Sequence, residues 1–149
     1  MIYKKKPQKF NSRFEVVSCF VEHQGEILLL HRQDYKPEGN TWGVPAGKVD
    51  EGEIVLNTIM REIQEETGFA LPPSKISYFD KVYVKYPGYD FVYHIFHACL
   101  DHKRKVSINP KEHKDFKWTS PKNALKMPLI QDLDTCIKLF YDNSNRKLI

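Results

Sequence analysis

Apolar residues alternate or run together in the manner of β-strands over five segments of the chain. These segments lie at residues 14–21, 27–31, 76–86, 89–100 and 116–118. They are rich in β-branched and aromatic residues, which favour strands. The turn formers between residues 23 and 26 predict that the first two segments form a hairpin, and Pro87-Gly88 predicts a hairpin turn between the third and fourth.

Two other regions have the spacing of helices. Val55, Leu56, Ile59, Met60 and Ile63 lie on one face of a predicted helix, which Gly68 ends as a C-cap. A short helix is predicted from Pro121 to Met127, and a longer one over residues 132–142. Residues 34–40 read as a loop and residues 41–46 as a short extended segment.

The order of strands, helix, strands and helix predicts one α/β domain over residues 1–149, in which helices enclose a mixed β-sheet. Residues 1–12 and 143–149 are predicted to be flexible ends. The chain length suits one domain with a substantial core.

Composition narrows the classes of protein. No apolar run approaches the roughly 20 residues that span a bilayer, and no secretory signal is evident. The chain has three cysteines, an odd number, and each lies among apolar residues: Cys19, Cys99 and Cys136. We therefore expect buried, reduced thiols. Reduced thiols in turn predict a cytoplasmic protein, and we expect no membrane partner. The net charge of +4 fits a solvated surface, or a positive potential that attracts polyphosphates.

Candidate chemistry is concentrated between residues 47 and 69. On a helix, Glu62, Glu65 and Glu66 project from neighbouring positions. Three clustered carboxylates repel one another unless a cation lies among them, and Mg²⁺ prefers carboxylate oxygens. The helix therefore reads as a metal platform. The alternative is a solvated acidic face with surface salt bridges.

The residues around this helix strengthen the metal hypothesis. Gly43, Gly47 and Gly52 permit tight turns and close approach of a ligand in the preceding loop. Arg61 lies four residues before Glu65, a spacing that allows an ion pair to orient the carboxylate.

The same segment matches a family signature at every specified position. These positions are Gly47, Glu53, Arg61, Glu62, Ile63, Glu65, Glu66, Gly68 and Phe69. The spacing resembles the Nudix box of the MutT-like Nudix hydrolases. Ala46 stands where many family members have a second glycine.

The resemblance implies an α/β/α sandwich with a central mixed sheet, and hydrolysis of a nucleoside diphosphate linked to another moiety. By position, it implies that Glu62, Glu65, Glu66 and the carbonyl of Gly47 bind Mg²⁺, with Mn²⁺ as a substitute. Arg61 would hold a carboxylate in place. Glu53 would support the helix or a second metal. Either Glu65 or Glu66 would accept the proton from water.

A further candidate lies downstream, in the sequence from Lys111 to Trp118. Several family members carry a Glu a few residues before a Trp, and Glu112 has that place here. It is a candidate metal ligand or general base, with His113 and Asp115 as substitutes. The alternative is an exposed charged loop.

Substrate contacts are less specified. Trp42, Tyr83, Tyr86 and Tyr89 are candidates for stacking on a nucleobase, although strand aromatics usually belong to the core. Arg32 and Lys48 flank the expected phosphate path. His94 and His97 are three residues apart on a predicted strand, so they face opposite sides and form no zinc pair.

The leading hypothesis is a Mg²⁺-dependent hydrolase of a small-molecule nucleotide: an NTP or dNTP, ADP-ribose or a dinucleoside polyphosphate. A catalytically silent Nudix-fold nucleotide-binding regulator is the alternative from another class. Hydrolysis at the 5′ end of RNA is the alternative among enzymes. The sequence leaves the oligomeric state open.

Overall fold

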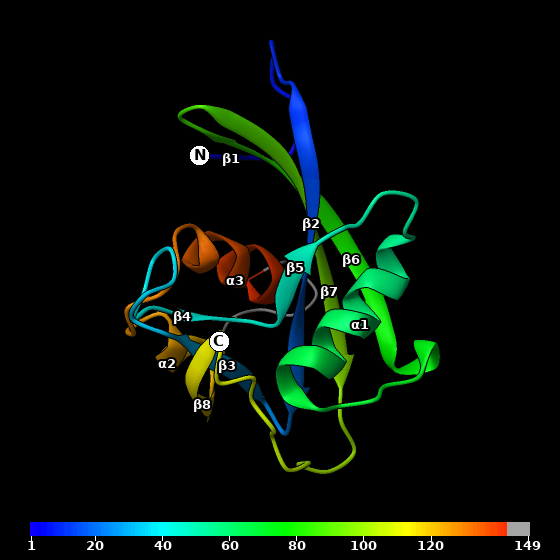
Figure 1. Ribbon diagram of the computed structural model, residues 1–149, viewed down its shortest axis with the longest axis vertical. Helices are drawn as coiled ribbons and strands as arrows, with labels where there is room; N and C mark the ends of the chain where they lie inside the picture. The colour runs from blue at the N-terminus through cyan, green and yellow to red at the C-terminus, as the bar shows by residue number, and fades with distance from the viewer. Residues whose placement is uncertain (143–149) are drawn as a thin grey trace.

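The computed structural model describes residues 1–142 and consists of one mixed β-sheet between two helical layers. The α1 helix covers one face of the sheet, and α2 and α3 lie on the other side (Figure 1). The predicted α/β/α sandwich is therefore confirmed. Residues 143–149, which were predicted to form a flexible end, lie outside the described residues.

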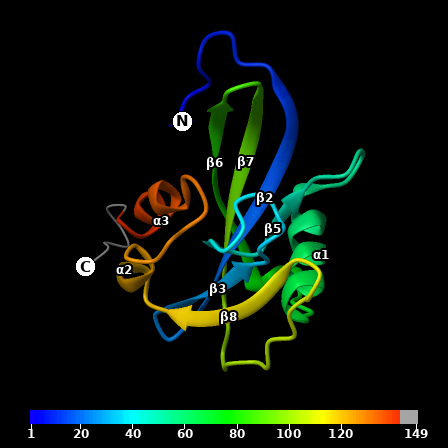
Figure 2. The same cartoon turned by 60° about the vertical axis from the view of Figure 1, so that its left-hand side comes forward.

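The sheet follows the order β1-β6-β7-β2-β3-β4, while β5 pairs with β2 and β8 pairs with β3. The strands are β1 (Ile2–Tyr3), β2 (Ser12–His23), β3 (Glu26–Arg32), β4 (Trp42–Gly43), β5 (Ala46–Lys48), β6 (Ile76–Tyr86), β7 (Tyr89–Cys99) and β8 (His113–Thr119). Strands β2 and β7 run parallel, and the other strand pairs are antiparallel. Both predicted hairpins are present (Figure 2).

The hairpin of β2 and β3 diverges soon after its turn. Gln24 and Gly25 both have positive φ, at 48° and 81°, as tight hairpin turns require. Only Glu22 and His23 of β2 then pair with β3. Further along, Val16 to Ser18 of β2 pair with β5 instead.

The α1 helix spans Val55–Thr67 as its apolar spacing predicts. Ile59 and Ile63 are fully buried against the sheet. Gly68 ends the helix at φ 81°, a left-handed conformation that glycine adopts without strain. A 3₁₀ turn, η1 (Pro73–Lys75), leads into β6.

The second helical layer consists of α2 (Pro121–Ala124) and α3 (Leu133–Tyr141). The α2 helix ends three residues before the predicted Met127. Pro128 contributes to this early end, since a residue that precedes proline disfavours helical backbone. No helix within residues 1–142 is long and apolar enough to cross a membrane.

Two details differ from prediction at the edges of the sheet. Ile2 and Tyr3 pair with β6, so part of the segment predicted to be a flexible end is a strand. Cys19 and Cys136 are buried as predicted, but Cys99 is exposed. Cys99 is the last residue of β7, where the alternation along the strand turns its side chain away from the buried face that holds Ala98.

His94 and His97 confirm the predicted alternation. His94 Nε2 contacts Glu15 at 2.6 Å, whereas His97 stacks on Phe140 of the α3 layer with ring centroids 4.9 Å apart. They lie on opposite faces of the sheet and form no joint site.

Replacing Ile63 by Ala tests whether the apolar face of α1 anchors the helix. We expect a loss of about 2–5 kcal/mol in the free energy of unfolding, because a buried aliphatic side chain leaves a cavity. Urea denaturation measures the loss. Gln64→Ala is the matched control because Gln64 is exposed on the same helix. Equal destabilisation by the two substitutions would contradict this account.

Candidate functional site

The carboxylate-bearing helix lies directly against the strand that precedes it. Gly47 of β5 faces Glu62 so closely that a Cβ atom at position 47 would lie 1.9 Å from Glu62 Oε2. No side chain fits at position 47 unless Glu62 moves. The absence of a side chain at position 47 therefore lets the β5 backbone lie directly beside the Glu62 carboxylate of α1.

Arg61 is the centre of an ion-pair network. Its Nε and Nη2 donate to the two oxygens of Glu53, both at 3.0 Å. Its Nη1 donates to Glu62 Oε2 at 3.1 Å and to Glu65 Oε1 at 3.2 Å. Its Nη2 also lies 3.5 Å from Asp50. The predicted pair with Glu65 is present, and one guanidinium ties the loop before α1 to the helix.

The pair between Arg61 and Glu53 is the best-defined part of this network. The Arg61 guanidinium and the backbone N–H of Asp50 hold the pKa of Glu53 down at about 2. The bond to Glu53 also raises the pKa of Arg61. Both groups stay charged at neutral pH, so the two-pronged contact persists.

The pKa values of Glu62 and Glu66 are shifted upward, in the opposite direction from that of Glu53. Glu66 is only 4% exposed, and burial raises its pKa well above the ordinary carboxyl value. A hydrogen bond to Glu62 and the nearby charges of Glu62 and Glu112 raise it further. Burial also raises the pKa of Glu62. Burial and these contacts therefore favour the protonated form of Glu66, while the Ala46 N–H donates to Glu66 Oε1 at 3.4 Å.

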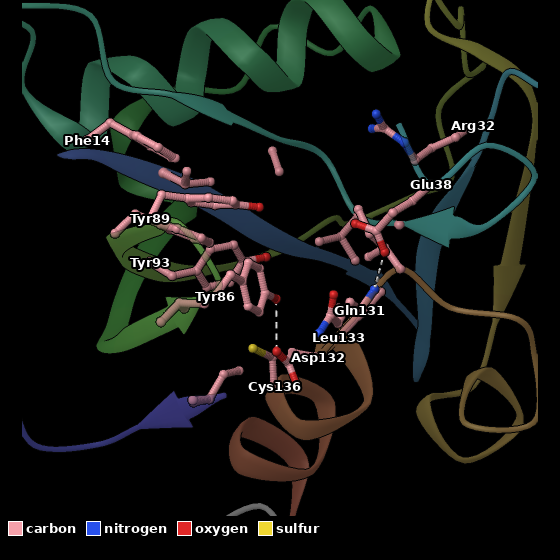
Figure 3. Close-up of a pocket in the computed structure, with 18 of the residues that line it drawn as sticks. Phe14, Arg32, Glu38, Tyr86, Tyr89, Tyr93, Gln131, Asp132, Leu133 and Cys136 are labelled. Atoms are coloured by element: carbon pink, nitrogen blue, oxygen red, sulfur yellow. Dashed lines mark hydrogen bonds between the residues drawn. The ribbon is translucent and has the colours of Figure 1, made fainter. Parts of the chain in front are cut away.

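Glu66 forms part of the wall of a cavity of about 270 Å³. The cavity lies on the α3 side of the sheet, where Leu133 and Cys136 line it, and α1 contributes Glu66. Its walls come from β2, β3, β6, β7, the segment between β4 and β5, and the start of α3 (Figure 3).

One end of the cavity is charged. It is lined by Glu66, Glu112 and Arg32. Glu112 pairs with Lys36 at 3.3 Å, and Arg32 Nε donates to the carbonyl of Pro37 at 2.8 Å. Carboxylates and guanidinium are thus brought together from α1, β3 and the loop before β8.

The other end of the cavity is aromatic. Phe14, Tyr89 and Phe91 lie nearly parallel, with the Phe14 and Phe91 centroids 5.1 Å apart. Tyr86 meets Tyr89 and Phe91 edge-on. Figure 3 shows Phe14, Tyr86, Tyr89 and Tyr93 gathered on one side, opposite Arg32 and Glu38.

A carboxylate closes the aromatic end from the α3 side. Tyr86 Oη donates to Asp132 Oδ2 at 2.8 Å. Burial and this bond raise the pKa of Tyr86, so the phenol keeps its proton.

A histidine beside Glu112 has an unusual environment. His113 lines the cavity, is 4% exposed and contributes the one buried side-chain atom within residues 1–142, Nδ1, that lacks a hydrogen-bond partner. Burial lowers its pKa to about 4, so the ring is neutral at physiological pH.

A NUDIX domain model matches residues 12–140 of the chain. The chain belongs to the Nudix family. It is 29% identical over 115 residues to a CTP pyrophosphohydrolase of Escherichia coli, covering 77% of this chain and 82% of that protein. It is 32% identical over 123 residues to an RNA pyrophosphohydrolase of Campylobacter jejuni, covering 75% and 77%.

A solved structure agrees with these relatives. The MutT NUDIX hydrolase of Burkholderia pseudomallei is 27% identical, with a TM-score of 0.70 that covers 84% of this chain and 95% of that one. The predicted family is confirmed. Relatives named as pyrophosphohydrolases confirm the predicted enzyme class, a Nudix pyrophosphohydrolase.

The charged Nudix box residues lie together around Arg61, whereas several of the predicted substrate-binding residues do not line the cavity. Trp42 stacks on His31 with centroids 4.2 Å apart and is not part of the cavity wall. Tyr83 packs edge-on against Phe10, also outside it. Lys48 lies 4.4 Å above the outer face of the Phe14 ring, and Asp115 is exposed on β8. Arg32, Tyr86, Tyr89 and Glu112 do line the cavity.

Sequence reasoning missed several cavity residues, namely Phe14, Glu38, Phe91, Tyr93 and Asp132. The aromatic residues among them alternate along strands as core residues do. Asp132 stands at the start of a predicted helix, a position that ordinarily signals a cap. Their pattern therefore carries no sign of a ligand.

Within residues 1–142, no three or more His, Cys, Asp and Glu side chains are already arranged to hold a metal ion. The physical reason is visible in the contacts. Arg61 engages Glu62 and Glu65, and burial raises the pKa of Glu66. A cation at the Nudix box would bind the ionised carboxylates and therefore compete with protons for them.

Replacing Glu66 by Gln tests its buried, protonated state. The folded protein binds this proton more tightly than the unfolded chain, so stability falls as pH rises above the ordinary carboxyl range near 4.5. Gln keeps the donor to Glu62 without ionising. We expect Glu66→Gln to raise the free energy of unfolding by about 1 kcal/mol or more at pH 8, since one pKa unit corresponds to about 1.4 kcal/mol.

Urea denaturation with chelator between pH 4.5 and pH 8 measures this gain, which should grow with pH. Glu51→Gln is the control, because Glu51 is exposed in the turn before α1. A gain that stays constant over this pH range would show that Glu66 ionises as an ordinary carboxyl.

Proposed function

We propose that this Nudix hydrolase cleaves the phosphoanhydride bond of a nucleoside diphosphate linked to another moiety, with Mg²⁺ as its cofactor. One observation carries the proposal: a single cavity joins Glu66 of the Nudix box to an aromatic wall. The charged end suits a diphosphate and the aromatic end suits a nucleobase. The substrate would therefore lie with its phosphates toward Glu66 and its base toward Tyr86 and Tyr89.

The residues present fit a divalent cation of the Mg²⁺ type. Every candidate donor is an oxygen, which hard cations prefer. The missing Cβ at Gly47 leaves its backbone beside Glu62. Glu62, Glu65, Glu66 and the Gly47 carbonyl would hold the ion, with Glu112 as a further candidate ligand from the same cavity. When bound, the cation would neutralise charge on the diphosphate oxygens and make water a better nucleophile.

The chain's own residues supply the positioning. Arg61 keeps Glu62 and Glu65 in one orientation and anchors them to Glu53, which supports the start of the helix. Arg32 faces the cavity from β3 and would bind a phosphate oxygen. Glu65, Glu66 and Glu112 are the candidates to accept the proton of the attacking water. Glu112 lines the same cavity as Glu66, within reach of its charge, so either carboxylate could take that proton.

Hydrolysis at an RNA 5′ end is the second candidate, and the identity to the Campylobacter jejuni RNA pyrophosphohydrolase favours it. The chemistry at phosphorus would be the same. The two candidates differ in what extends from the ribose.

A substrate panel tests the proposal. NTPs, dNTPs, ADP-ribose, dinucleoside polyphosphates and triphosphorylated RNA are each incubated with Mg²⁺ or Mn²⁺, and phosphate, pyrophosphate or monophosphate release is measured. We expect hydrolysis of at least one class and loss of about 100-fold or more in kcat for Glu66→Gln, as for other electrostatic catalytic groups.

Glu51→Gln should retain wild-type activity. Nucleotide binding without hydrolysis under any of these conditions would instead favour a silent binding regulator. Retention of full metal-dependent activity in Glu66→Gln would remove Glu66 from the mechanism.

Replacing Gly47 by Ala tests the close approach of β5 to α1. The added Cβ collides with the Glu62 carboxylate, so we expect a fall of about tenfold or more in kcat/KM and weaker Mn²⁺ binding by electron paramagnetic resonance. Gly43→Ala is the matched control, since a Cβ there would meet only Ile130 at 3.7 Å. The same loss in both variants would point to general damage to the strand segment.

A further inference from the structure

Three neighbouring strands hold a chain of hydrogen bonds outside the cavity. Tyr78 Oη of β6 lies 2.9 Å from His94 Nδ1 of β7, and His94 Nε2 lies 2.6 Å from Glu15 Oε1 of β2. None of these three residues lines the cavity that contains Glu66. A hydroxyl, an imidazole and a carboxylate in this order form the arrangement that activates hydroxyl nucleophiles in hydrolases.

A bulge in β6 brings Tyr78 to the face of the sheet that His94 occupies. Lys81 is the β6 residue that pairs with His94, and in a regular strand a side chain three positions away points to the opposite face. The register of β6 shifts between Tyr78 and Asp80, where one extra residue reverses the direction of Tyr78. The Tyr78 ring then packs edge-on against Phe96, with centroids 5.1 Å apart. The bulge therefore completes the chain of hydrogen bonds.

The protons in this chain have one consistent direction when the imidazole is neutral. An ionised carboxylate has only acceptor sites, so His94 Nε2 carries the ring proton and donates it to Glu15. His94 Nδ1 is then the unprotonated nitrogen, and it accepts the hydroxyl proton of Tyr78. His94 is therefore placed as a general base toward the phenol, and Glu15 fixes its tautomer.

The base is buried, whereas the hydroxyl residue is accessible. His94 is 7% exposed, and the Ser18 hydroxyl donates to its backbone carbonyl at 3.1 Å, so the imidazole is held in one place. Tyr78 is 48% exposed, so a molecule from solvent can reach it. Burial and the charges of Asp80 and Glu15 raise the pKa of Tyr78. The phenol is therefore not ionised beforehand and depends on the base for its reactivity.

We propose that Tyr78 is a site of covalent acylation, with His94 as its general base and an activated carboxylic ester as the acyl donor. The phenol oxygen attacks the ester carbonyl carbon while its proton passes to His94 Nδ1. The bond to the leaving group then breaks, the leaving oxygen keeps the electron pair, and His94 gives its extra proton to solvent. This modification goes beyond the proposed hydrolysis and does not depend on it.

The charges around Tyr78 favour a neutral acyl donor over a phosphoryl donor. Asp80 and Glu15 both place negative charge near the phenol. Lys81 is the cation next to Asp80 in the sequence, and its Nζ lies 5.9 Å from the centre of the Tyr83 ring. A phosphoryl donor carries negative oxygens that the two carboxylates repel, whereas an ester carries no charge.

Acetylation by p-nitrophenyl acetate at neutral pH tests the proposal. Release of p-nitrophenolate is followed by absorbance, and peptide mass spectrometry locates the acetyl group. We expect Tyr78 to be acetylated about tenfold or more faster than Tyr35, because a positioned general base accelerates such steps by about 100-fold or more in enzymes. Tyr35 is 70% exposed, but its hydroxyl donates to the Lys111 carbonyl, which is no base. Equal or faster acetylation of Tyr35 would overturn the proposal.

His94→Gln removes the base but keeps a side chain that forms hydrogen bonds. Tyr78 should then be acetylated as slowly as Tyr35, and an unchanged rate would contradict the role of His94. Because His94 is buried, circular dichroism first shows whether this variant is folded. If it is not, the decision passes to the exposed Glu15.

Glu15→Gln should slow the acetylation of Tyr78 several-fold, because the His94 ring loses the group that fixes its tautomer. Asp80→Asn is the matched control: it removes a negative charge near Tyr78 but neither hydrogen bond of His94. This control should not slow the reaction. The same loss of rate in both variants, or none in Glu15→Gln, would show that the hydrogen-bonded chain does not activate Tyr78.

Discussion

The site depends on one guanidinium that is surrounded by carboxylates. Glu53, Glu62 and Glu65 all bond to Arg61, and Asp50 lies close by. Without a cation among them these acidic groups would repel one another and separate the loop from the helix. Arg61 supplies that cation permanently, so the acidic cluster exists before any metal arrives. The lowered pKa of Glu53 reflects how firmly one side of the network is held.

The cavity joins two environments with different electrostatics. At the Nudix end, burial raises the pKa of Glu66, and the charges of Arg61 and Glu62 lie 3.1 Å apart. At the other end, aromatic rings lie beside Asp132, which accepts the Tyr86 hydroxyl. A nucleotide has the same division, with anionic phosphates at one end and a flat, partly apolar base at the other. This correspondence links the shape of the cavity to its proposed ligand.

How far the sequence predicts this structure depends on the range of the interactions involved. The α1 helix, its end at Gly68 and the cluster of Glu62, Glu65 and Glu66 follow from spacing within a dozen residues. Glu112 could be named from its distance to Trp118. The aromatic wall could not, because Phe14, Tyr86 and Asp132 meet only after three distant segments pack together. The stacking of Trp42 on His31 could not be predicted for the same reason, since His31 lies across a strand pair.

The parallel pairing of β2 with β7 constrains the order in which the molecule can assemble. Val17 pairs with His94, far along the chain, whereas β6 and β7 are joined by a two-residue turn. Closing such a long loop costs chain entropy before any contact compensates for it, and topologies rich in distant contacts fold slowly. The α1 helix and the two hairpins can form early from neighbouring residues. The cavity has walls from β2, β7 and α3, so it is complete only once these segments have packed together, and a nascent chain lacks the complete site until α3 has been synthesised.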